Sequence, residues 1–118
     1  MAYPNIVNVA TINGKTDVFA LTTTETNLVT ATANTVFKIN SILVSNIDGS
    51  NAADVTIKYN DGSNDRAIAS TISIPADASL AVVDKNTSFY LEENEIIKGT
   101  ASANSDLECL ISYEIISD

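Results

Sequence analysis

The C-terminal part of the chain carries the clearest structural signal in the sequence. It reads Leu107-Glu108-Cys109-Leu110-Ile111-Ser112-Tyr113-Glu114-Ile115. Every second residue of this run, beginning with Leu107, is apolar. Successive side chains of a β-strand point to opposite faces of a sheet, so the pattern predicts a strand with one face in a hydrophobic core. We therefore expect a fold built from sheets.

The rest of the chain contains further runs with the same period of two. Val55, Ile57 and Tyr59 alternate with polar residues, and turn signals rich in Gly, Asn, Asp and Ser separate one run from the next. No long window shows the apolar spacing of an amphipathic helix. Roughly eight to ten strands at intervals of about ten residues predict an all-β single domain, an antiparallel β-sandwich of jelly-roll-like form.

The longest extended run covers residues 36–47, and it is apolar on both faces. Its large apolar residues divide into Phe37, Ile39 and Leu43 on one face and Ile42 and Val44 on the other. Two interpretations fit this pattern. Either the strand is covered on both sides, or a β-bulge changes the direction of its side chains partway along.

Two interpretations are open for the N-terminal residues. In the first, Ile6 to Ile12 is a strand, and Asn13-Gly14 turns it into a return strand, because Asn-Gly strongly favours a two-residue hairpin. In the second, residues 1–12 precede a sandwich domain of residues 13–118, and the first of them form an arm that docks on a partner by adding a strand. The residues proposed for this arm are Tyr3, Pro4, Ile6, Val7 and Val9.

Two similar turns, thirteen positions apart, interrupt the middle of the chain. They are Asp48-Gly49-Ser50-Asn51 and Asp61-Gly62-Ser63-Asn64-Asp65. Asp-Gly sequences are common at hairpin ends, and we interpret both as hairpin turns. Asp48 or Asp61, with Asn51, Asn64 or Asp65, could in principle bind calcium, but neither turn has the spacing of an EF-hand loop. We expect no metal and no cofactor.

Charge argues against two classes of partner. The formal net charge is −9, and the six basic residues are scattered, no two of them adjacent. Nucleic-acid binding needs a basic stripe, and an anionic membrane would repel the chain.

The single cysteine rules out a disulfide within the chain and favours a reducing compartment or a virion assembled in one. We expect no signal peptide and no transmembrane span.

The residues that usually carry catalysis are scarce. The chain has no histidine, so Ser-His-Asp and Cys-His arrangements cannot exist. Cys109 shares the apolar face of its strand and is interpreted as a core residue. Glu92, Glu93 and Glu95 could act as paired carboxylates on a glycoside, but sugar sites also need aromatic platforms, and the chain has no Trp. We interpret these three residues as part of a solvated loop, and we expect that the protein is not an enzyme.

Several segments carry a resemblance to a known family. They are Ile42 to Thr56, Ile74 to Val83, and Tyr90 to Glu93 with its continuations Ala101 to Ala103 and Ser112 to Glu114. Together they resemble a group of small virion proteins of tailed bacteriophages that are common in marine phages. The resemblance runs from about residue 35 to the C-terminus, and its motifs are turn and strand patterns.

This resemblance implies a capsid decoration, or cement, protein that binds the major capsid protein on an icosahedral shell. It also implies a homotrimer at local threefold positions, located in the virion after assembly in the host cytoplasm. A tail, baseplate or head-fibre component would use the same fold and surface. A carbohydrate-binding β-sandwich is a further alternative, against which the absence of Trp argues.

Overall fold

The structure is a computed structural model that describes residues 4–118. Over these residues the chain forms nine strands and no helix. The strands are β1 (Thr11–Ala20), β2 (Thr26–Thr30), β3 (Thr35–Asn46), β4 (Ala53–Asn60), β5 (Asp65–Ile74), β6 (Ser79–Val83), β7 (Phe89–Leu91), β8 (Ile96–Ala101) and β9 (Leu107–Ser117). The predicted all-β antiparallel sandwich is confirmed.

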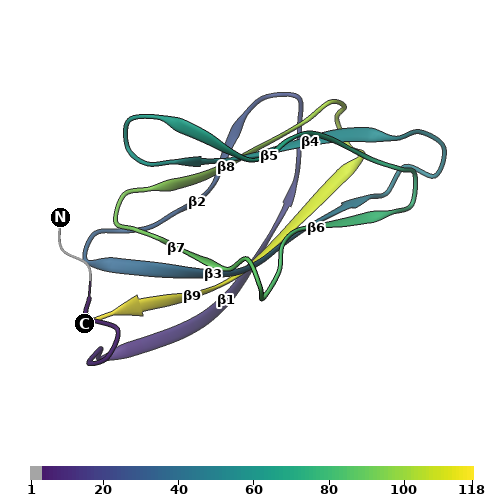
Figure 1. Ribbon diagram of the computed structural model, residues 1–118. Coiled ribbons are helices and arrows are strands. Elements are labelled where there is room, and N and C mark those ends of the chain that lie inside the picture. Colours follow the sequence, from purple (N-terminus) through teal and green to yellow (C-terminus); the bar gives the residue numbers. More distant parts are fainter. Residues whose placement is uncertain (1–3) are drawn as a thin grey trace.

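The strands form two sheets that face each other (Figure 1). The first sheet has the order β1-β9-β3-β6, with β7 pairing beside β6 along the same edge of β3. The second has the order β2-β8-β4-β5. The chain crosses repeatedly between the sheets and brings its first strand beside its last, as in a jelly roll.

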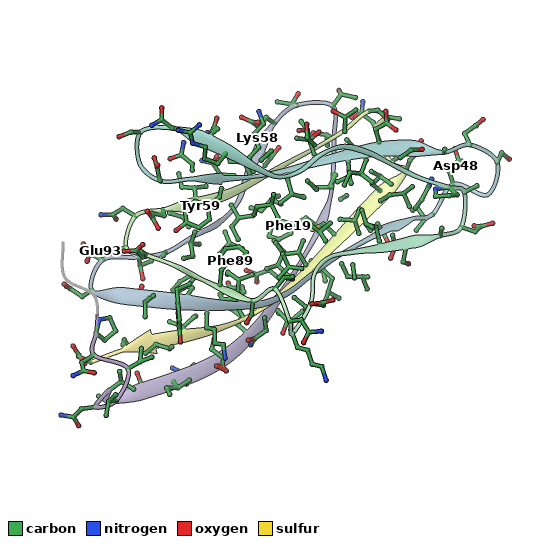
Figure 2. The ribbon with its side chains drawn as sticks, viewed as in Figure 1. Phe19, Asp48, Lys58, Tyr59, Phe89 and Glu93 are labelled. Carbon is green, nitrogen blue, oxygen red and sulfur yellow. The ribbon has the colours of Figure 1, made fainter. Side chains whose placement is uncertain are left out.

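The hydrophobic core lies between the inner faces of the two sheets. Its fully buried large side chains come from both sheets and include Ile39, Ile42, Ile57, Ile74, Leu91, Ile97, Leu107 and Ile111. Phe19, Tyr59 and Phe89 pack against this cluster from its margin, and Figure 2 shows them between the sheets. Gly99 of β8 also faces the core, because a Cβ there would lie only 2.7 Å from Leu28 Cδ1.

β9 holds the first sheet together because it pairs along its length with both β1 and β3. Its inward residues Leu107, Cys109, Ile111 and Tyr113 are all buried, as the alternation predicted. The Tyr113 ring stacks on Phe37 of β3 at 5.1 Å between centroids. The Tyr113 hydroxyl donates a 2.6 Å hydrogen bond to Asp17 of β1, so one side chain connects three strands.

The apolar residues on both faces of β3 are explained by a bulge. The register of β3 against β9 shifts between Ile39 and Ser41, which places one extra residue in β3. After this shift Ile42 and Val44 point into the core, as do the residues before it. The bulge interpretation is therefore confirmed. The grouping of Leu43 with the core-facing residues is wrong, because Leu43 lies on the outer face.

The predicted Asn13-Gly14 hairpin is wrong. Both residues lie inside β1, whose register with β9 is unbroken from Thr11 to Ala20. Of the strand expected over residues 6–12, only Thr11 and Ile12 are extended, as the start of β1, whereas Ile6 to Asn8 form a turn in which Asn8 N donates to Asn5 O at 3.0 Å. A ladder with a long partner strand has overridden the local preference of Asn-Gly for a turn.

The two Asp-Gly turns serve different connections. Residues 61–64 join β4 to β5 within one sheet, as a hairpin. Residues 48–51 instead connect β3 of the first sheet to β4 of the second, so their interpretation as a hairpin is wrong. The local chemistry is the same, because Asp48 Oδ1 and Asp61 Oδ1 each accept hydrogen bonds from backbone N–H groups two and three residues later. Such a turn does not specify which sheet the next strand joins.

Adjacent residues of β9 provide a test of this core. Ile111→Ala should lower the free energy of unfolding by about 2–5 kcal/mol, because it opens a cavity between the sheets. Leu110→Ala removes a similar side chain from the outer face, where Leu110 is 37% exposed, and should cost clearly less. Urea denaturation of both variants makes the comparison, and equal losses would contradict the assignment of faces.

Candidate functional site

The outer face of the second sheet carries a network of ion pairs. Lys58 of β4 and Lys98 of β8 lie directly opposite each other in the ladder, where two like charges repel. Glu25 lies 3.0 Å from Lys58 Nζ, and Asp65 lies 3.2 Å from Lys98 Nζ. The hydrogen bond and charge of Glu25 raise the pKa of Lys58 above its ordinary value. This face is thus charged and internally compensated.

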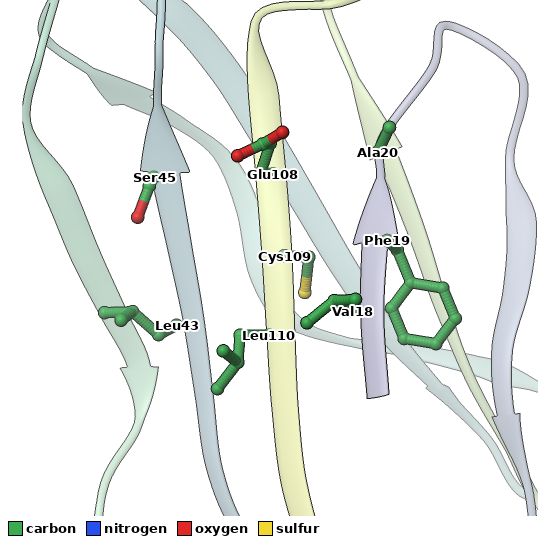
Figure 3. A pocket seen from close by; sticks show the side chains of 8 residues that line it. All are labelled: Val18, Phe19, Ala20, Leu43, Ser45, Glu108, Cys109 and Leu110. Atoms are coloured by element: carbon green, nitrogen blue, oxygen red, sulfur yellow. The ribbon is translucent and has the colours of Figure 1, made fainter. Parts of the chain in front are cut away.

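The outer face of the first sheet is different. Val18, Leu110 and Leu43 are register partners on three neighbouring strands, so they form a row across the sheet (Figure 3). Their exposed fractions are 72%, 37% and 37%. We call these three residues the apolar row. The row lies beside a shallow hollow that Ser45 and Glu108 also line.

Five of the six ladder positions on either side of the apolar row carry small or hydroxyl side chains. One neighbouring set is Ala20, Glu108 and Ser45, and the other is Thr16, Ser112 and Ser41. Glu108 is the single charged residue among these six. A contiguous group of exposed apolar residues can mark a surface that binds another protein. The row was missed in the sequence because it depends on the pairing of three distant strands.

The proposed arm residues are placed apart from the apolar row, as far as the structure describes them. Tyr3 lies outside the described residues. Pro4 is buried, and with Ile6 it lines a second hollow together with Val36, Tyr90 and Glu92. Val7 is 90% exposed and Val9 is half-buried. The arm stays a prediction, since nothing in this arrangement tests docking on a partner.

The acidic loop between β7 and β8 is not solvated as expected. Glu93 and Glu95 are buried, with exposed fractions of 7% and 8%. Glu93 accepts a hydrogen bond from the backbone N–H of Asn34. Glu95 accepts one from the Tyr59 hydroxyl and another, 2.9 Å long, from the backbone N–H of Glu92. These carboxylates therefore hold the loop against its neighbours, and the solvated-loop interpretation of Glu93 and Glu95 is wrong.

The other side chains that could act as nucleophiles or as metal ligands do not form a cluster in residues 4–118. Burial raises the pKa of the Cys109 thiol to about 12, which leaves it protonated at neutral pH. Hydrogen bonds from the backbone lower the pKa of Asp48 and Asp61, whose Oδ1 atoms face their own turns. In residues 4–118 no three His, Cys, Asp or Glu side chains come together as metal ligands would. The same part of the chain contains no helix that could cross a membrane.

No protein-family model matches this chain, and no curated protein sequence does. Two of the solved structures that share its fold are as follows. A chain of the disulfide-linked pili of Bacillus endospore appendages is 12% identical, with a TM-score of 0.54, covering 92% of this chain and 88% of the other. A chain of the acidic stable capsid of Helicobacter pylori bacteriophage KHP30 is 8% identical, with a TM-score of 0.54, covering 92% and 90%.

At such identities the likeness shows the fold alone. One neighbour comes from a pilus and the other from a phage capsid, so this jelly roll occurs in protein assemblies of both kinds. The likeness to these two chains does not reach the finer resemblance to decoration proteins of tailed phages.

The Glu95 contacts lead to a test with a matched control. Tyr59→Phe removes a donor to a buried carboxylate and should lower the free energy of unfolding by about 1–3 kcal/mol. Tyr90→Phe makes the same change at a side chain that is 43% exposed and should stay within about 0.5 kcal/mol of the unsubstituted protein. Denaturation curves that do not separate the two variants would contradict a structural role for Glu95.

Proposed function

We propose that this chain is a non-enzymatic structural subunit of a phage virion, and that it decorates a capsid shell. The apolar row on the outer face of the first sheet is the observation that carries the proposal. A subunit that binds a shell needs an exposed, weakly charged surface on a rigid support, and β1, β9 and β3 supply one. Virion location is part of the proposal.

Three further observations support an assembly role. The fold occurs in a pilus and in a phage capsid. The sequence resemblance from about residue 35 onward is to small virion proteins. The buried carboxylates Glu93 and Glu95, the groups best suited to acid–base chemistry, accept hydrogen bonds from the protein's own backbone and from Tyr59. A structural role uses all of these features and requires no reaction.

The proposed partner is the major capsid protein or another virion protein. The chain carries a net charge of −9, whereas the apolar row and its two neighbouring sets contain one charged residue, Glu108. Contact through this face would bring few like charges together, and the charged outer face of the second sheet would remain in solvent. The trimer implied by the resemblance is part of this proposal, as is the absence of nucleic-acid and membrane partners.

Two other functions are compatible with the same fold. A tail, baseplate or head-fibre component would also use an exposed sheet face. A carbohydrate-binding module would need aromatic side chains lining a groove. The hollow lined by Tyr59, Phe89 and Tyr90 is the nearest feature of that kind, and it makes this alternative testable by glycan binding.

Copy number and binding separate these functions. In purified virions, hundreds of copies on the shell in electron micrographs support decoration, whereas a few dozen copies at the tail would contradict it.

Leu43→Glu should weaken binding of the purified protein to undecorated shells more than about tenfold, because a charge would be buried. Thr30→Glu, at an exposed position of β2 in the other sheet, is the control and should bind normally.

The arm has its own test. Deletion of residues 2–5 should leave a folded protein with reduced binding to shells or reduced self-association, because a docked arm contributes main-chain hydrogen bonds. Circular dichroism checks the fold, and co-sedimentation with shells measures binding. Unchanged binding would show that residues 2–5 are not an arm and that the contact lies elsewhere.

A further inference from the structure

β1 presents a long and regular free edge. It lies at the end of its sheet and, within residues 4–118, pairs only with β9, over ten consecutive positions without a register shift (Figure 1). An edge strand of this kind exposes a row of unpaired N–H and C=O groups that can pair with another chain. Proteins usually protect such edges with bulges, proline, short strands or charged side chains. β1 has no bulge and no proline, and its two charged residues, Lys15 and Asp17, form an ion pair with each other.

The other edges of the sandwich are interrupted. β5 shifts register twice against β4, and Thr71 within it has a positive φ of 49°. β2 has five residues and one register shift. On the far edge of the first sheet, β6 and β7 have five and three residues. The free edge of β1 is thus the best template for strand addition within residues 4–118.

The direction of the free groups of β1 follows from its pairing with β9. Leu21 N donates to Leu107 O at 2.9 Å, one step beyond the last register pair of Ala20 with Glu108. In an antiparallel ladder, hydrogen-bonded and non-hydrogen-bonded pairs alternate. The outward backbone groups of β1 therefore belong to Ile12, Gly14, Thr16, Val18 and Ala20.

We propose that two copies of this chain associate through their β1 edges, as an antiparallel pair centred on Thr16 and related by a twofold axis. In such an isologous contact, residue i of one copy lies opposite residue 32 − i of the other. Thr16 is one of the residues whose backbone groups point outward. The contact would join the first sheets of the two copies into one continuous sheet.

Charge complementarity selects this register. Lys15 of one copy lies opposite Asp17 of the partner, and Asp17 lies opposite the partner's Lys15, which gives two opposite-charge pairs. Within one chain these two side chains are already 3.5 Å apart, on the same face of the strand. Centring the pair on Lys15 or on Asp17 would instead place identical charges against each other.

Side-chain size supports the same register. Val18, which is 72% exposed, would lie opposite Gly14 of the partner. Ile12, which is 56% exposed, would lie opposite Ala20 of the partner. Each bulky apolar side chain thus meets a small residue, so the pairing would cover the exposed end of the apolar row without crowding. The inference goes beyond shell binding and does not depend on it.

Cysteine cross-linking of the full-length protein tests the register. Residues in a hydrogen-bonded antiparallel pair have Cα atoms about 5.5 Å apart, a distance that a disulfide can span. Thr16→Cys should therefore form a covalent dimer under mild oxidation, at least about tenfold faster than Thr30→Cys on β2. The buried native Cys109 should not compete.

Two further variants distinguish the register from a general tendency to associate. Gly14→Cys and Val18→Cys should each cross-link poorly alone, yet should cross-link efficiently when the two proteins are mixed. Light scattering of the unsubstituted protein, free of any shell, should give a mass that approaches two chains as concentration rises, because the trimer proposed above is an arrangement on the shell. A monomer at all concentrations, a trimer without cross-linking at position 16, or equal rates for positions 16 and 30 would each overturn the proposal.

Discussion

The pairing of β9 with strands on both of its sides is the interaction on which the rest of the structure depends. It joins β1 to the end of the chain, across 106 residues between Thr11 and Ser117. Because the ladders on either side are continuous through most of their length, the inward residues of β9 define the core, and the outward ones define the exposed face. Among the described strands β1 pairs only with β9, which is why its other edge remains open.

Much of the fold could be predicted because several strands have a local alternation of apolar and polar residues. The alternation in Leu107 to Ile115 needs no knowledge of a partner strand, and neither does the pattern of β4. The Asn13-Gly14 turn was predicted wrongly for the opposite reason, since only the presence of β9 allows the chain to continue straight through it. The burial of Glu93 and Glu95 likewise depends on Asn34 and Tyr59, which are distant in sequence.

The candidate surfaces were hidden in the sequence because they exist only in register. Val18, Leu110 and Leu43 are unremarkable single residues until three strands align them. The difference between the two outer faces matters more for function than any one residue. One face pairs its charges internally, while the other carries apolar and hydroxyl side chains, with Glu108 among them, beside an open edge. A sandwich built in this way has a surface for a shell and an edge for a second copy of itself.

Residue-specific amide hydrogen exchange tests the open edge most directly. In dilute protein the amides of β1 that point toward β9 should be protected by it. The amides that point away from β9, at the open edge, should exchange quickly. At high concentration the account predicts that protection also appears at the outward amides, those of Ile12, Gly14, Thr16, Val18 and Ala20. Fast exchange of these amides at every concentration would contradict it, because the β1 edge would then have no partner.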